Sequence, residues 1–117
     1  MFDLNAKRAL VTGATQGIGY EVARLLSEHG AKVFVAGSRN IEKCRRASAV
    51  IPNSTPVVAD LTLPDCAERL YEATGEVDIL VLNASIQYKR DWDGFSEEEY
   101  EAQWNCNCKS SYYLIKK

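Results

Sequence analysis

A cluster of three glycines, directly after an apolar run, constrains this chain more than any other feature. Gly13, Gly17 and Gly19 follow Ala9-Leu10-Val11 and precede an amphipathic helical pattern. A strand, a tight turn and a helix in this order bring free backbone N–H groups close to a phosphate. Gly13 permits the turn, Gly17 leaves room for a pyrophosphate, and Gly19 lets the helix pack on the strand. The pattern indicates a nucleotide-binding turn, and the alternative is a structural turn without a ligand.

The composition is that of a single globular domain spanning residues 1–117. The net charge is −2, with 46% hydrophobic and 26% charged residues, so no nucleic-acid or membrane partner is expected. No apolar run approaches the ~20 residues of a membrane span, and the first residues do not resemble a signal peptide, which favours the cytoplasm. Four cysteines form no C-x-x-C pair. Cys106 and Cys108 would point to different helix faces, so we expect no metal site.

Strand and helix patterns alternate along the chain, without repeats or linkers. This alternation predicts an α/β fold, a three-layer, Rossmann-type, doubly wound parallel sheet. The order expected for the first half of such a sheet is 3-2-1-4. The strands are expected near residues 7–12, 32–37, 56–60 and 77–82, with a loop over Pro52–Pro56. The last of these strands is apolar nearly throughout, so we expect it to be buried on both faces.

Helical spacing predicts which side chains face the core. In the first helix the spaced residues are Ile18, Val22, Leu25, Leu26 and His29, before a terminating Gly30. In the helix expected over 64–74 the inward residues are Ala67, Leu70, Tyr71 and Thr74. Ser96 and Glu99 form a capping box for the last helix. On that helix one face carries Tyr100, Trp104, Asn107, Ser111 and Leu114.

The spacing T-G-x-x-x-G-x-G over Thr12–Gly19 resembles the short-chain dehydrogenase/reductase family, in its short-subunit branch. The resemblance covers nearly all of this chain but only the N-terminal half of such a protein. The sheet would thus be truncated after the helix that follows the fourth strand. The resemblance implies a dinucleotide cofactor whose phosphates lie against Gly13, Thr15, Gln16, Gly17, Ile18 and Gly19.

The end of the second strand bears on the choice of cofactor. In dinucleotide binders an acidic side chain there binds the free 2′-hydroxyl of NAD. This chain has Ser38 and Arg39 instead. The planar guanidinium of Arg39 suits a 2′-phosphate, with Ser38 as a further donor, so NADP is favoured over NAD. The alternative is that Arg39 is a solvated turn residue.

Two further strand ends match the family. The resemblance implies that Asp60 and Leu61 lie beside the adenine, with Asp60 accepting from the exocyclic amine. A helix N-cap is the other reading of Asp60 or Thr62, and the two roles are compatible. Asn83 and Ala84 correspond to the family's Asn-Asn-Ala-Gly segment, and the resemblance implies that they contact the cofactor ribose. This chain departs from that segment at both of its ends, with Leu82 and Ser85.

The resemblance also implies one catalytic residue. Asn107 matches the helix asparagine that sits at a helix irregularity and holds a proton-relay water, while a buried polar helix residue is the alternative. Asn105 is interpreted as incidental. The family's catalytic serine, tyrosine and lysine belong to a later strand and helix. Tyr112 and Lys116 satisfy Y-x-x-x-K, but no serine strand precedes them, so an ordinary i,i+4 pair is expected.

The sequence therefore favours the NADP(H)-binding half of an oxidoreductase that transfers hydride between NADP(H) and an alcohol or carbonyl. This chain alone is expected to be catalytically incompetent, and to form homo-oligomers through the last helix or the open edge of the fourth strand. The alternative is a non-catalytic nucleotide-binding half-domain that acts through assembly. An unrelated doubly wound domain, such as a methyltransferase, would have an acid where Ser38-Arg39 stands.

Overall fold

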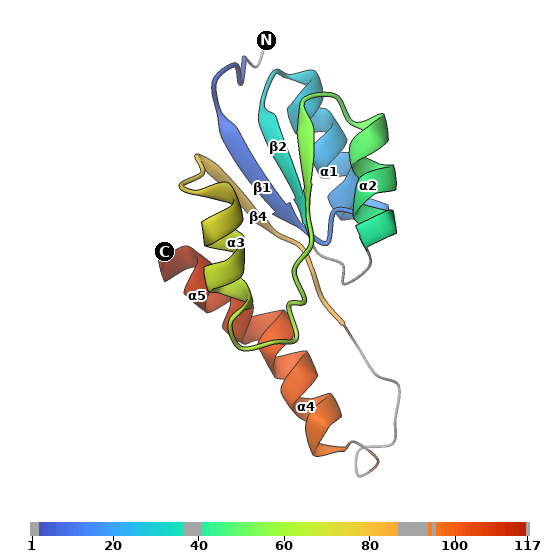
Figure 1. The fold of residues 1–117 in the computed structure, drawn as a ribbon, viewed down its shortest axis with the longest axis vertical. Coiled ribbons are helices and arrows are strands. Elements are labelled where there is room, and N and C mark those ends of the chain that lie inside the picture. The colour runs from blue at the N-terminus through green and yellow to red at the C-terminus, as the bar shows by residue number, and fades with distance from the viewer. Residues whose placement is uncertain (1–2, 37–40, 87–93, 95, 117) are drawn as a thin grey trace.

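A four-stranded parallel sheet forms the centre of the chain. The computed structural model describes residues 3–36, 41–86, 94 and 96–116. The strands are β1 (Arg8–Thr12), β2 (Lys32–Ala36), β3 (Ser54–Val57) and β4 (Ile79–Leu82). They pair in the order β3-β2-β1-β4, every pair parallel (Figure 1). The predicted fold class and strand order are thus confirmed.

Helices cover both faces of the sheet (Figure 1). One face carries α1 (Gly17–Glu28) and α2 (Ile41–Val50), and the other carries α3 (Cys66–Thr74) and the C-terminal helix. That last helix is continuous through α4 (Glu97–Trp104), a π-helical segment η1 (Asn105–Lys109) and α5 (Ser110–Lys116). Figure 1 shows α5 beside α3, while α4 extends beyond the carboxyl ends of the strands.

Alternation along the strands supplies a separate apolar core to each face. Leu10 and Phe34 point into the core under α3, η1 and α5. Val11 and Val33, their neighbours in sequence, point into the core under α1 and α2. The sheet is therefore held between two helical layers, which leaves the carboxyl ends of the strands for a site.

Strand β3 begins and ends earlier in the sequence than predicted. It covers Ser54–Val57, so the loop expected over Pro52–Pro56 contributes residues to the sheet. Pro56 pairs with Val35 of β2, and no described strand lies on the other side of β3. A proline lacks a backbone N–H but is tolerated on such an edge strand. The hydroxyl of Ser54, bonded to the carbonyl oxygens of Ser48 and Ile51, fixes the start of the strand.

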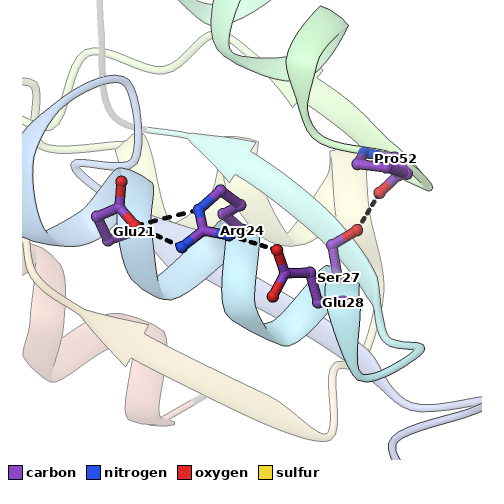
Figure 2. A network of polar contacts seen from close by, with 5 residues as sticks. All are labelled: Glu21, Arg24, Ser27, Glu28 and Pro52. Carbon is purple, nitrogen blue, oxygen red and sulfur yellow. Dashed lines mark hydrogen bonds and ion pairs between the residues drawn. The ribbon is translucent and has the colours of Figure 1, made fainter.

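The inward face of α1 differs in part from the predicted one, although Leu26 packs against the core as expected. Ile18 and Leu25 are 76% and 46% exposed, whereas the buried residues are the small Gly19, Ala23 and Ser27. Small side chains let the helix approach the sheet closely. Ser27 also donates a hydrogen bond to the carbonyl oxygen of Pro52 and so links α1 to the segment before β3 (Figure 2).

The outer face of α1 carries an ion-pair network. Arg24 pairs with Glu21 at 2.8 Å and also with Glu28 (Figure 2). All three side chains are substantially exposed, so solvent screens the pairs and they add little stability. The network marks this face as a solvated surface.

The remaining helices follow the predictions in part. Ala67, Leu70 and Thr74 of α3 are buried as expected, but Tyr71 is 38% exposed. The capping box of Ser96 and Glu99 is present. Tyr100 and Trp104 are exposed, contrary to the single face expected for the last helix. Both lie on α4, which extends beyond the carboxyl ends of the strands and has no buried residue (Figure 1).

Strand β4 is half-buried rather than buried on both faces. It pairs with β1 along one edge, and no strand among the described residues pairs with the other. Arg8 holds the segment that precedes β4, because its guanidinium donates to the carbonyl oxygens of Thr74 and Glu76. The backbone N–H of Arg8 donates to the carboxylate of Asp78 at 2.9 Å.

Candidate functional site

Three loops meet in a groove at the carboxyl ends of the strands. They follow β1, β3 and β4, and the groove has a volume of about 370 Å³. Seven of the predicted cofactor residues line it: Gly13, Thr15, Gln16, Asp60, Leu61, Asn83 and Ala84. In a doubly wound sheet, the crevice at the carboxyl ends of the strands is where ligands bind.

The hydroxyl of Thr12 joins the ends of β1 and β4. It accepts hydrogen bonds from the backbone N–H groups of Asn83 and Ala84, at 3.1 and 3.2 Å. It also donates to the carbonyl oxygen of Val81 at 3.4 Å. Thr12 is 2% exposed, so these backbone groups find their partner away from water. The hydroxyl therefore fixes the loop after β4 relative to the glycine turn.

The glycine turn is closely packed on the inside and open on the outside. A Cβ atom on Gly13 would lie 2.8 Å from the Cα of Ala84, and Gly13 has a φ of +66°. A Cβ on Gly19 would lie 2.2 Å from the carbonyl oxygen of Gly13. The Asn83 amide occupies the remaining space, since its Nδ2 donates to that same oxygen at 3.2 Å. Gly17 has a φ of +63° and nothing within 4 Å of its Cβ position.

Asp60 lies in a side-chain-stabilised turn. Its Oδ1 accepts from the backbone N–H and the hydroxyl of Thr62, at 3.0 and 2.6 Å. Helix α3 begins at Cys66 with Asp65 in the N-cap position. The N-cap reading of Asp60 and Thr62 is therefore wrong, and both residues belong to the wall of the groove.

Two asparagines of η1 reach two different loops. The side chain of Asn107 accepts from the N–H of Ile86 and donates to its carbonyl oxygen, both at 2.8 Å. Asn107 is exposed and lies in the π-helical segment η1, and its assignment to the family's helix asparagine stays a prediction. Asn105 is 8% exposed and donates to the carbonyl oxygen of Thr62 at 2.8 Å. Its interpretation as incidental is corrected, because this hydrogen bond joins η1 to a residue that lines the groove.

The two buried thiols near the groove are expected to be unreactive. Desolvation raises the pKa of Cys106, which lines the groove, to about 11. The pKa of Cys66 is also raised, mainly by burial. Both thiols stay protonated at neutral pH, so they are poor nucleophiles and poor metal ligands. Among the residues that the structure describes, no group of three or more His, Cys, Asp or Glu could hold a metal ion.

Some predicted residues lie elsewhere. Ser38 and Arg39 fall outside the described residues. Gly17 and Ile18 are exposed at the start of α1, and Gly19 is buried beneath the turn.

The structure adds residues that sequence reasoning missed. Lys43, on the first turn of α2, and Ser85 both line the groove. A basic residue four positions after Arg39 was the available signal for Lys43. No sequence pattern distinguished Asn105 from other polar helix residues.

Comparisons with known proteins agree with this geometry. The short chain dehydrogenase family matches residues 7–117. The 3-oxoacyl-acyl-carrier-protein reductase FabG of Rickettsia prowazekii is 32% identical over 114 residues, covering 97% of this chain and 47% of its own.

Two solved structures are similar to this chain in both fold and sequence. A short chain dehydrogenase from Burkholderia cenocepacia in complex with NADP is 30% identical, with a TM-score of 0.83, covering 97% of this chain and 48% of its own. A 3-ketoacyl-(acyl-carrier-protein) reductase from Brucella melitensis complexed with NADH is 30% identical, with a TM-score of 0.85, covering 97% and 49%.

The chain therefore belongs to the short-chain dehydrogenase family, whose members are oxidoreductases with a Rossmann-type nucleotide site. It spans about half the length of the curated relatives it matches. In the described part of the chain, no helix is both long and apolar enough for a bilayer.

The close approach at Gly19 gives a testable prediction. We expect Gly19→Ala to lower the free energy of unfolding by about 1–3 kcal/mol, because the added methyl forces α1 away from Gly13 and Asn83. Urea unfolding measures this. Gly17→Asn is the matched control, since its side chain meets open space and asparagine tolerates positive φ. An equal or smaller loss in Gly19→Ala than in the control would contradict the packing argument.

Proposed function

We propose that this chain is the NADP(H)-binding part of an oxidoreductase that transfers hydride between NADP(H) and a small alcohol or carbonyl substrate. The convergence of the glycine turn, the Asp60 turn and the Asn83 loop in one groove carries this proposal. The phosphates would lie at the N-terminus of α1, against Gly13, Thr15 and Gln16, where backbone N–H groups favour anions. Asp60 and Leu61 would hold the adenine, and Asn83 and Ala84 the nicotinamide-side ribose.

The preference for NADP rests on charge at the adenosine end. Arg39 stands where NAD binders carry an acid, and Lys43 adds a second cation at the groove. The relatives do not decide between the two cofactors, because one was solved with NADP and another with NADH. A guanidinium contact with a 2′-phosphate is a charge-assisted, two-pronged interaction that NAD cannot make.

We expect Arg39→Ala to lower the ratio of NADP affinity to NAD affinity by about tenfold or more, the value of one such contact. Calorimetric titration of both cofactors measures the ratio. Arg46→Ala, which removes the same charge from an exposed position of α2 that does not line the groove, should leave it unchanged. An unaltered ratio in Arg39→Ala would count against the 2′-phosphate role.

Catalysis by the family type needs a serine, a tyrosine and a lysine beyond the residues that bind cofactor. The tyrosine passes a proton to the carbonyl oxygen, and the lysine lowers the pKa of that tyrosine. Within these 117 residues we assign only Asn107 to this machinery, through its place in η1. Tyr112 is exposed on α5 and packs edge-on against Tyr113, with ring centroids 5.1 Å apart. It does not line the groove.

Purified residues 1–117 should therefore show no hydride transfer with NADPH or NADH and a panel of ketones and aldehydes. Absorbance of the reduced nicotinamide at 340 nm measures turnover. Tyr112→Phe is the companion variant, because it removes only the phenolic hydroxyl. Turnover that this substitution abolishes would make Tyr112 the proton donor and overturn the assignment.

We also propose that the chain associates with copies of itself, in the cytoplasm and without nucleic acid or membrane as a partner. One edge of β4 pairs with no strand among the described residues, and backbone N–H and C=O groups on such an edge can template pairing with another copy. The last helix exposes apolar and aromatic side chains, with Tyr112 and Ile115 at 62% and 69%. Exposed patches of this kind tend to mark interfaces.

Light scattering over a concentration series should show an apparent mass that rises above that of a monomer. If the helix contributes, Ile115→Lys lowers the association, while Val50→Lys, an equally exposed change at the end of α2, does not. A monodisperse monomer at every concentration, with an ordered last helix, would contradict the proposal.

A non-catalytic half-domain that acts through assembly is the second candidate. The departures at Leu82 and Ser85 favour it, because Ser85 places a side chain on the groove where the family has glycine. This second candidate predicts that the chain binds nucleotide and associates with itself. It also predicts that even a longer chain shows no turnover.

A further inference from the structure

Asn105 is a buried polar side chain that the proposed mechanism does not use. It occupies the first position of η1, is 8% exposed, and donates through Nδ2 to the carbonyl oxygen of Thr62 at 2.8 Å. The partners are 43 positions apart, so this bond ties the last helix to the loop after β3. The bond is part-buried, and breaking it costs free energy because it leaves the Asn105 amide without this acceptor and the Thr62 carbonyl without this donor.

Thr62 is also the residue that orients Asp60. The backbone N–H and hydroxyl of Thr62 both donate to Asp60 Oδ1, and the N–H of Leu63 donates to the Asp60 carbonyl oxygen at 3.0 Å. The backbone N–H of Thr62 thus donates to the Asp60 carboxylate, while the carbonyl oxygen of the same residue accepts from Asn105. Displacing that carbonyl would displace the turn that carries Asp60 into the groove.

The segment η1 contacts two different loops. Asn105 and Asn107 are two residues apart, yet one bonds the loop after β3 and the other the loop after β4. Both loops line the groove. The single segment η1 therefore supports two walls of the site, and Asn105 supports the wall on the adenine side.

We propose that Asn105 is a positioning residue for base recognition: its amide holds the Thr62 carbonyl so that the Asp60 carboxylate meets the exocyclic amine of adenine. The inference rests on the proposed function, since it presupposes an adenine nucleotide in the groove. It predicts that loss of the amide reduces selectivity for adenine rather than binding in general. The phosphate-binding turn lies on another loop, so its contribution to affinity remains.

The test compares NADP⁺ with its hypoxanthine analogue, in which a carbonyl oxygen replaces the exocyclic amine. Calorimetric titration gives the ratio of the two affinities. We expect wild type to prefer NADP⁺ by about tenfold, the value of a hydrogen bond to a charged acceptor. Asn105→Leu, which is nearly isosteric but lacks the amide, should bring the ratio within about twofold of unity.

Further variants separate positioning from stability. Asn105→Ser also lacks the amide and is tested in case the leucine variant does not fold, with circular dichroism as the check. Asn105→Gln retains a donor and should recover part of the ratio. Leu114→Val loosens the same helix at a buried position away from Thr62, so it should lower the melting temperature but leave the ratio unchanged.

The outcomes of these titrations distinguish a failure of the inference about Asn105 from a failure of the proposed function. If wild type binds neither nucleotide, the proposed function fails and the inference with it. If wild type binds both equally, cofactor binding stands but the adenine contact and the role of Asn105 are overturned. If wild type discriminates and a folded Asn105→Leu or Asn105→Ser discriminates equally well, the inference alone is wrong.

Discussion

The close contact between the ends of β1 and β4 is the constraint on which the rest of this structure depends. Neither Gly13 nor Gly19 has room for a methyl group, because Gly13 packs against Ala84 of the loop after β4 and Gly19 packs against Gly13. The buried hydroxyl of Thr12 and the amide of Asn83 satisfy the backbone groups that this approach takes out of water. These contacts bring the start of α1 over the carboxyl end of the sheet, where an anion can meet its N–H groups.

The C-terminal helix completes the groove from the other side. In its π-helical segment, Asn105 bonds the loop after β3 and Asn107 bonds the loop after β4. Binding residues are commonly carried on loops and positioned by a rigid scaffold. In this chain the scaffold includes helix side chains as well as strands, so the site depends on the last helix although that helix provides little of its lining.

The sequence was sufficient for the features that local chemistry dictates. Alternating apolar strands and helices fixed the sheet class, and the glycine spacing located the turn. Features decided by packing were predicted less well. The face of α1 was misjudged because close approach favoured Gly19 and Ala23 over the larger Ile18 and Leu25. The hydrogen bond of Asn105 could not be predicted, because its partner is a backbone carbonyl 43 positions away in the sequence.

Amide chemical-shift mapping of the wild-type chain during titration with NADP⁺ tests the central claim most directly. The account predicts that perturbed resonances cluster at the three loops that form the groove, over residues 13–19, 60–62 and 83–86. Smaller shifts should extend into η1 through Asn105 and Asn107. Saturable binding with shifts confined to another surface, or no shifts at millimolar nucleotide, would contradict it.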